Sequence, residues 1–215
     1  MDSASALGAN DAIGWGQLNL PAGQAVQVYT GPLTVVSTNG NAATVSVGGD
    51  HMLVRVDQAP GGDYYGNFPP GMQLIVTCAN CPSGGSDEPI VINFSQPVYG
   101  GGAQVGAGSY GPYNAIVMAF SGAHLQGTYS VAATTTTDGL NNPAPFIGLL
   151  SDSPNITSLV FFADSVSSVD QTALGTVSLN VHPGVPEPSS WAMMLLGFTG
   201  LGFAFRQSQR KASLP

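Results

Sequence analysis

The sequence predicts an all-β protein: an antiparallel β-sandwich, jelly-roll-like, followed by a single C-terminal transmembrane helix. Three observations lead to this prediction. Short β-branched runs alternate apolar and polar residues and are separated by Gly, Pro and Asn turns. No stretch of residues 1–185 repeats its apolar residues with the 3.6-residue period of a helix. Residues 191–205 carry no charge and are apolar on every face of a helix.

The predicted strands follow one another at short intervals, as they do in sandwiches. Asn39-Gly40 is the strongest hairpin signal, because this dipeptide favours the tight turn between two strands. Trp15 lies between two glycines in a turn-rich N-terminal segment, and we expect it to pack as a lid on the core, with stacking on a ligand as the alternative. The strands are expected at residues 25–30, 33–38, 43–47, 52–57, 72–77, 89–94, 98–105, 113–120, 125–131, 144–150, 156–162 and 174–181.

Charge is scarce and unevenly placed along the chain. Only 7% of the 215 residues are charged, and the four Lys and Arg residues leave Arg55 as the sole cation of residues 1–185. A domain with one cation cannot neutralise a row of phosphates, so the composition excludes nucleic-acid binding. An acidic surface without Lys fits an extracytoplasmic protein.

The two cysteines, Cys78 and Cys81, are separated by two residues and followed by a Pro-Ser-Gly-Gly turn segment. We expect a local disulfide that pins this loop in an oxidising compartment. Two free thiols are the alternative. A zinc site would need two further ligands, and a redox site of this spacing would need a βαβ context that the sequence lacks.

The C-terminal part divides by composition into three segments after a domain at residues 1–182. Residues 183–190 form a linker, residues 191–205 a transmembrane helix, and residues 206–215 a basic cytoplasmic tail. The helix would span about 22 Å, short of the roughly 30 Å hydrocarbon core, which suits a temporary hold in the membrane. The basic residues that mark its cytoplasmic end are Arg206, Arg210 and Lys211.

The linker motif Val185, Pro186, Glu187 and Pro188, followed by an apolar helix and a basic end, resembles the PEP-CTERM sorting signal of Gram-negative, exopolysaccharide-producing bacteria. The resemblance implies that the Pro-Glu-Pro residues are recognised by exosortase, a membrane protease. Cleavage near the motif would release the domain or transfer it to the surface matrix. The C-terminal region of this family also carries the label ice-binding protein C-terminal domain, which by itself does not indicate ice binding.

The tail predicts export: a precursor held in the inner membrane, then a protein at the cell surface or outside the cell after processing. Residues 1–10 have neither the basic start nor the apolar stretch of a signal peptide. Because a sorting helix implies an exported chain, we expect that the N-terminal signal peptide is missing from this sequence.

No catalytic pattern stands out in the domain. Residues 106–111 have the composition of a nucleophile elbow but not its spacing. The leading interpretation is therefore a non-enzymatic surface or extracellular-matrix protein, without a cofactor, associated with exopolysaccharide or the cell envelope. Asp138 and Asp152 are candidate ligands for a structural calcium, with solvated turn acids as the alternative.

Two other functions stay open. The first is a carbohydrate-binding module whose site uses the loop aromatics Tyr64, Tyr65 and Phe68. Exposed, coplanar rings would favour it, and rings turned inward would exclude it. The second is a secreted hydrolase, which requires two acids or a Ser–His pair converging in one cleft.

Overall fold

The structure is a computed structural model that describes residues 1–22, 24, 26–58, 67–79, 86, 88–136, 142–165 and 171–181. These residues form strands and one short 3₁₀ helix, η1 (Trp15–Gln17), which confirms the all-β prediction. Within the described residues, no helix is long and apolar enough to cross a membrane. The predicted transmembrane segment at residues 191–205 lies outside them. Residues Met1–His182 form one compact unit and Pro183–Pro215 a second.

The first sheet has eight strands in the order β1-β14-β8-β13-β6-β5-β2, with β11 on the other side of β8. β13 and β14 lie end to end against the same edge of β8, so together they act as one interrupted strand. The bounds are β1 (Asp11–Ile13), β2 (Val26–Tyr29), β5 (Met52–Asp57), β6 (Gln73–Cys78), β8 (Gly100–Ala107), β11 (Phe146–Leu150), β13 (Thr172–Leu174) and β14 (Val177–Asn180).

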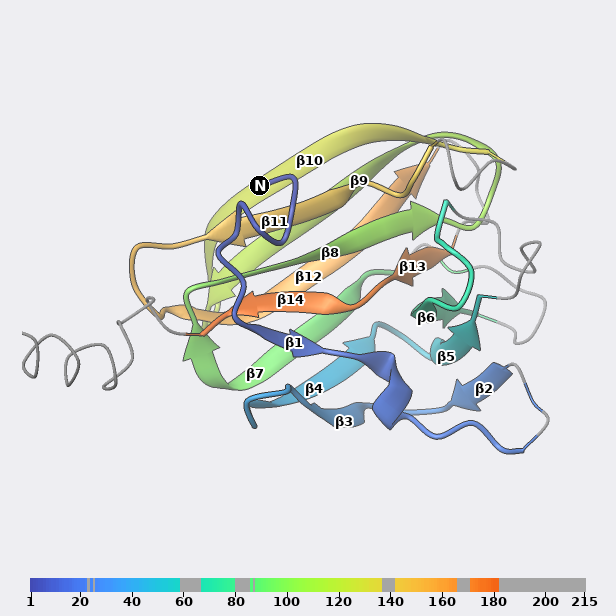
Figure 1. The fold of residues 1–215 in the computed structure, drawn as a ribbon, viewed down its shortest axis with the longest axis horizontal. Coiled ribbons are helices and arrows are strands. Elements are labelled where there is room, and N and C mark those ends of the chain that lie inside the picture. The colour runs from blue at the N-terminus through green and yellow to red at the C-terminus, as the bar shows by residue number, and fades with distance from the viewer. Residues whose placement is uncertain are drawn as a thin grey trace, which may run out of the picture. The chain divides into compact units, whose positions relative to one another are not determined.

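The second sheet has six strands in the order β10-β9-β12-β7-β4-β3. All strand pairs in both sheets are antiparallel, and most connections cross from one sheet to the other. Figure 1 shows the two layers, with β7, β9, β10 and β12 in one and β8, β11, β13 and β14 in the other. The bounds are β3 (Leu33–Val36), β4 (Ala42–Val47), β7 (Ile90–Val98), β9 (Gly111–Ser121), β10 (His124–Thr135) and β12 (Ile156–Ser165).

The core lies between the sheets and is built by alternation along each strand. Every second side chain points inward, as with Val105 on β8, Val117 on β9 and Phe161 on β12, all fully buried. Members of this one cluster come from both sheets, so the predicted antiparallel sandwich is what buries the apolar surface. Burial of this kind contributes roughly 25 cal/mol per Å² of apolar surface.

The N-terminal segment closes one side of the sandwich. Trp15 is fully buried, and its indole N–H donates to the carbonyls of Leu174 and Gly175 at 3.0 and 2.9 Å, so the predicted lid is confirmed. The predicted hairpin at Asn39-Gly40 joins β3 to β4, and Gly40 adopts a φ of 89° that favours glycine.

Asp11 ties β1 of the first sheet to that hairpin in the second. Its buried carboxylate accepts the Ser37 hydroxyl and, at 2.8 Å, the backbone N–H of Asn39. The backbone N–H of Thr38 donates to the Ala12 carbonyl at 2.9 Å. These contacts give an acidic residue of the N-terminal segment a structural role, because a buried carboxylate needs such donors.

A second, smaller core covers the outer face of the first sheet. Val54 of β5, Val76 of β6 and Ala173 of β13 face outward there and are buried under Phe68 and Ala144. The Phe68 ring lies so close to β8 that a Cβ added at Gly106 would stand 2.7 Å from it. The loop residue Phe68 is therefore a packing residue of the sheet.

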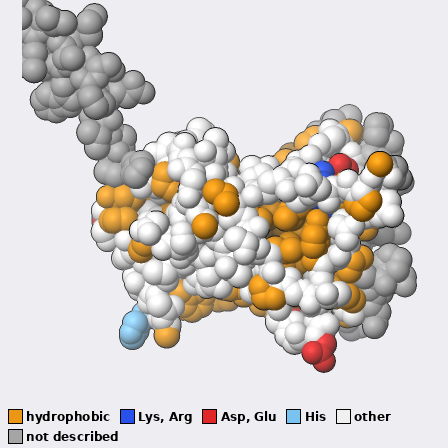
Figure 2. Space-filling view, turned by 90° about the horizontal axis from the view of Figure 1, so that it is seen from below, with side chains coloured by type: hydrophobic (Ala, Val, Ile, Leu, Met, Phe, Trp, Pro, Cys, Tyr) orange, Lys and Arg blue, Asp and Glu red, His pale blue; other side chains and the backbone are white. Residues whose placement is uncertain are grey.

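Charged side chains are sparse on the described surface. Figure 2 shows one face on which most atoms are neutral polar or hydrophobic, with a hollow that exposes hydrophobic side chains. Leu18, Leu33 and Val47 pack against the main core while remaining partly exposed. A ligand on the face shown would therefore be contacted largely by neutral groups.

Candidate functional site

The outer face of the second sheet carries a row of three exposed side chains on neighbouring strands. Asp164 of β12 is the register partner of Asn114 of β9, and Asn114 is the partner of Ala132 of β10. Side chains directly opposite each other in an antiparallel pair have Cβ atoms about 4.5–5.5 Å apart. All three are exposed, because their strands turn the alternate residues toward the core.

A hollow of about 360 Å³ opens over this row. Its lining also includes Pro112 and Thr134, which are paired one step further along β9 and β10. Within the described residues neither Asp164 nor Asn114 commits its side chain to a hydrogen bond. A carboxylate, a carboxamide and a hydroxyl beside a proline ring can accept and donate hydrogen bonds to a polyhydroxyl ligand and contact its apolar faces.

A second hollow, of about 180 Å³, lies over the same face on the strands β3, β4 and β7. Thr34, Thr44 and Asn93 line it and occupy one row by register. Asn93 is also the partner of Ser158, which precedes Asp164 by six positions on β12, so the two hollows are about 20 Å apart along the strands.

An apolar band separates the two hollows. Val160 of β12 pairs with Val91 of β7 on one side and with Met118 of β9 on the other. These side chains share the outward phase of the polar rows and are half-buried or buried. The face thus presents a polar hollow, an apolar band and a second polar hollow, without a cation among the side chains named.

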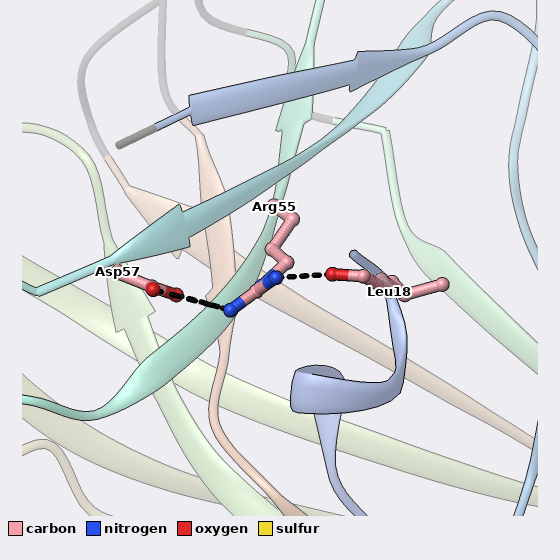
Figure 3. Close-up of polar contacts among 3 residues, drawn as sticks. All are labelled: Leu18, Arg55 and Asp57. Atoms are coloured by element: carbon pink, nitrogen blue, oxygen red, sulfur yellow. Dashed lines mark hydrogen bonds and ion pairs between the residues drawn. The ribbon is translucent and has the colours of Figure 1, made fainter. Parts of the chain in front are cut away.

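Arg55 is the one Lys or Arg side chain within the described residues, and it is paired inside the domain. Its side chain is 6% exposed, and its Nη2 lies 2.8 Å from Asp57 Oδ1 in an ion pair. The guanidinium also donates to the Leu18 carbonyl, as Figure 3 shows. A paired, buried guanidinium cannot serve an anionic ligand, so the described surface offers no basic group beyond its histidines and the N-terminus.

One serine and one histidine do come together. His51 Nδ1 is hydrogen-bonded to Ser86 Oγ, which also accepts the backbone N–H of Glu88 at 3.2 Å. Ser86 is only 3% exposed, and its carbonyl accepts the Thr77 hydroxyl at 2.8 Å. These contacts hold Ser86 against β6 and shield its hydroxyl from solvent. A catalytic serine has to reach the carbonyl of a substrate, so this arrangement does not favour a nucleophilic role for Ser86.

The predicted aromatic site is wrong for Phe68. That ring is 2% exposed and packs in the second core, because an apolar ring covering Val54 and Val76 removes more apolar surface from water than an exposed one. Tyr64 and Tyr65 lie outside the described residues. Because Phe68 points inward, one of the three rings of the predicted carbohydrate-binding site is not available to a ligand.

The other predicted site residues are placed as follows. Cys78 is buried and disulfide-bonded, and Cys81, the other cysteine of the sequence, lies outside the described residues. Asp152 is exposed in the turn between β11 and β12, and Asp138 lies outside the described residues. Among the described side chains, no group of three or more His, Cys, Asp or Glu is arranged to hold a metal.

Sequence reasoning did not find Asp164, Asn114 and Thr134. The alternation of residues 113–120 shows that Asn114 shares a phase with Ile116, but the pairing of β9 with β12 brings Asn114 beside a residue about fifty positions away in the sequence. The sequence does carry one sign of this site: Asp164 is a single acidic residue at the end of an otherwise apolar strand.

The all-β domain is followed in the chain by a C-terminal segment that carries a sorting signal. That signal is PEP-CTERM: residues 184–211 match the family model described as the PEP-CTERM protein-sorting motif, which contains all the predicted motif and basic residues. The chain is therefore a surface or extracellular protein targeted to exosortase, and it is anchored in the membrane before processing.

Solved structures include a chain with low similarity to this one. A DUF4465 family protein from Bacteroides caccae ATCC 43185 is similar at a TM-score of 0.43 and 11% sequence identity, over 80% of this chain and 100% of that one. Similarity at this level has no bearing on function. No curated protein matches the chain.

Proposed function

We propose that this protein is a non-enzymatic component of the cell surface or extracellular matrix that binds neutral polysaccharide through the outer face of its second sheet. The observation that carries the proposal is the exposed row of Asp164, Asn114 and Ala132 under a hollow of about 360 Å³. The sorting signal supports the proposal because it directs the domain to the cell surface or the extracellular space, where it could meet such polymers.

The charge of the domain selects the class of polysaccharide. Arg55 is buried and paired, and the face itself contributes the carboxylate of Asp164. Polymers rich in uronic acid or sulfate would bring like charge to this face without a cation to offset it. Neutral chains would meet the Asp164 carboxylate together with hydroxyl, amide and apolar groups, without repulsion between like charges, and the second hollow extends the contact along the strands.

The finer architecture belongs to the same proposal. Residues 191–205 would cross the membrane as a helix, with Arg206, Arg210 and Lys211 on the cytoplasmic side, until exosortase cleaves near Pro188. The sandwich, jelly-roll-like in its strand crossings, would then leave for the surface.

The test compares glycan binding by the full-length chain in detergent with binding by the double variant Asn114→Ala/Asp164→Ala. Each lost hydrogen bond costs about 1 kcal/mol, so the variant is expected to bind neutral polysaccharide about tenfold to a hundredfold more weakly. The matched control is Asn19→Ala/Asp2→Ala, which removes one exposed carboxamide and one exposed carboxylate elsewhere and should bind as the parent does. Equal binding by both variants, or parent binding only to acidic polymers, would contradict the proposal.

The competing function is hydrolysis, which one observation favours: the contact between His51 and Ser86. Our proposal that the protein is not an enzyme predicts no labelling of Ser86 by a fluorophosphonate probe, because the residue is 3% exposed and its hydroxyl also accepts a backbone N–H. Labelling is read by intact mass against a serine hydrolase as positive control. A probe adduct that Ser86→Ala abolishes would replace the non-enzymatic proposal with the hydrolase.

A further inference from the structure

The edge strands of the two sheets differ in length and in how far other segments cover their backbone groups. An edge strand presents unpaired backbone N–H and C=O groups, and proteins usually shorten, cover or charge such edges to prevent pairing with another chain. The first sheet ends at β1, β2 and β11, and the second at β3 and β10. Four of these five edge strands are covered or short, and one leaves its outward backbone groups without a partner among the described residues.

Two edges are covered by hydrogen bonds from other segments. On β3 the Gln17 side chain takes both backbone groups of Val36: its Oε1 accepts the N–H at 2.7 Å and its Nε2 donates to the carbonyl at 3.0 Å. On β11 the Gly148 N–H donates to the Met1 carbonyl at 3.1 Å, and the Met1 amino group donates to the Gly148 carbonyl at 3.0 Å.

Two more edges are short. β1 has three residues, and its Ala12 carbonyl accepts the backbone N–H of Thr38 at 2.9 Å. β2 has four residues. A pairing of such length offers a second chain few hydrogen bonds. These edges therefore resemble those of ordinary monomeric sandwiches.

β10 differs, because it has twelve residues and pairs only with β9. Thr134 is opposite Pro112, which has no N–H, and its carbonyl accepts the side-chain amides of Asn67 and Asn142 at 2.8 and 2.6 Å. The backbone groups of Thr134 thus point away from β9. In an antiparallel ladder residues two apart share this direction.

It follows that Thr128, Ser130 and Ala132 direct their backbone N–H and C=O groups outward, and we call these groups the β10 edge. Their register with β9 is unbroken, since the irregularity of this pair falls earlier, between Leu125 and Gly127. No described residue covers the β10 edge with a hydrogen bond. All three residues are exposed.

The sequence of β10 also lacks the usual protection. From residue 124 to residue 135 there is no Lys, Arg, Asp, Glu or Pro. Five of its twelve residues are of types that favour strands, namely three Thr, one Val and one Tyr. A long, neutral and regular edge is a template for strand addition.

We propose that two copies of this chain pair through β10, antiparallel about a two-fold axis at Ser130, so that two six-stranded sheets become one. Ser130 then faces its own copy, Thr128 faces Ala132, and Tyr129 faces Val131. The three outward pairs exchange two hydrogen bonds each, about six in all. A two-fold axis lets the same residues serve both partners.

Self-complementarity is what identifies a second copy as the occupant. The outer side of the joined strands brings together small side chains only, and the inner side pairs an aromatic with a β-branched residue. No like charges meet, although the whole chain carries a net charge of −8. A strand of different sequence would have to place small side chains on the outer side and suitable apolar side chains on the inner side, without a symmetry axis that provides both.

Pairing has a consequence for ligand binding that rests on the proposed function. Ala132 and Thr134 of β10 line the larger hollow, so the dimer would place two such hollows on one continuous face. A polymer could then occupy both, and the second contact would be intramolecular, which raises avidity without new contacts.

The first test is sedimentation of the full-length chain in detergent over a range of concentrations, without glycan. Ser130→Lys places two ammonium groups opposite each other at the axis, and we expect at least a tenfold rise in the dimer dissociation constant. The matched control is Thr44→Lys, an exposed residue of the same sheet on β4, which should dimerise as the parent does. A monomeric parent, or a Ser130→Lys variant that dimerises like the parent, overturns the proposal.

The second test locates the axis and separates β10 pairing from association through the tail. Hydrogen-bonded cross-strand Cα atoms lie about 5.5 Å apart, within disulfide range, so oxidised Ser130→Cys should yield a covalent dimer. Thr44→Cys should not. Equal cross-linking of the two variants, or none at residue 130, counts against the proposal. Because neither test contains glycan, failure of the dimer leaves the polysaccharide proposal to its own experiment.

Discussion

Replacing Glu187 with alanine in the full-length precursor is expected to abolish its processing and leave it in the membrane fraction. Glu187 is the only Asp, Glu, Lys or Arg between Asp170 and Arg206. Proline restricts φ to about −65°, so the two prolines that flank Glu187 are expected to favour an extended motif that offers the carboxylate to a protease. A protease that recognises the motif within 184–211 has no other charge on this side of the apolar segment to bind.

The measurement is fractionation of an exosortase-producing host, followed by intact mass of each fraction. The parent should yield a mature form ending near Pro188, whereas Glu187→Ala should lose at least nine-tenths of it, since a charge-assisted contact is worth about 1.5–3 kcal/mol. Ser190→Ala, three positions away, is the matched control and should be processed normally. A mature form that is equally abundant in Glu187→Ala would show that the carboxylate is not the recognised group.

The sequence predicted most reliably those features that depend on neighbours in the chain. The hairpin at Asn39-Gly40 follows from the turn preference of that dipeptide, and the sorting signal follows from the order of motif, apolar segment and basic end. Trp15 was also placed correctly, because a large ring in a turn-rich segment has to be buried against something. These predictions needed no knowledge of which strands pair.

Features that depend on pairing were missed. The row of Asp164, Asn114 and Ala132 exists only because β12, β9 and β10 are neighbours, and alternation alone does not reveal neighbours. Phe68 was mistaken for a ligand contact because its loop reads as exposed, whereas the outer face of the first sheet is apolar and needs covering. The sequence also shows Arg55 as a lone cation without showing that Asp57 and Leu18 use it.

Substituting Gly102 with alanine is expected to lower the free energy of unfolding by about 3 kcal/mol or more. Gly102 of β8 is opposite Gly148 of β11, where a Cβ would stand 2.6 Å from the Ile147 carbonyl oxygen and 2.8 Å from the Gly148 Cα. Both are backbone atoms of a paired strand, so relief requires β11 to move away from β8 and its hydrogen bonds to lengthen. A side-chain obstacle would instead give way by rotation.

Urea unfolding of the full-length variants, followed by circular dichroism in the far ultraviolet, measures this effect. The matched control is Gly14→Ala, where a Cβ meets no heavy atom within 4 Å and φ is −98°, so its midpoint should lie close to that of the parent. If Gly102→Ala unfolds at the same urea concentration as Gly14→Ala, β8 and β11 do not approach as closely as described. The glycine run would then reflect flexibility of the strand, and the close approach of the two backbones would not be its cause.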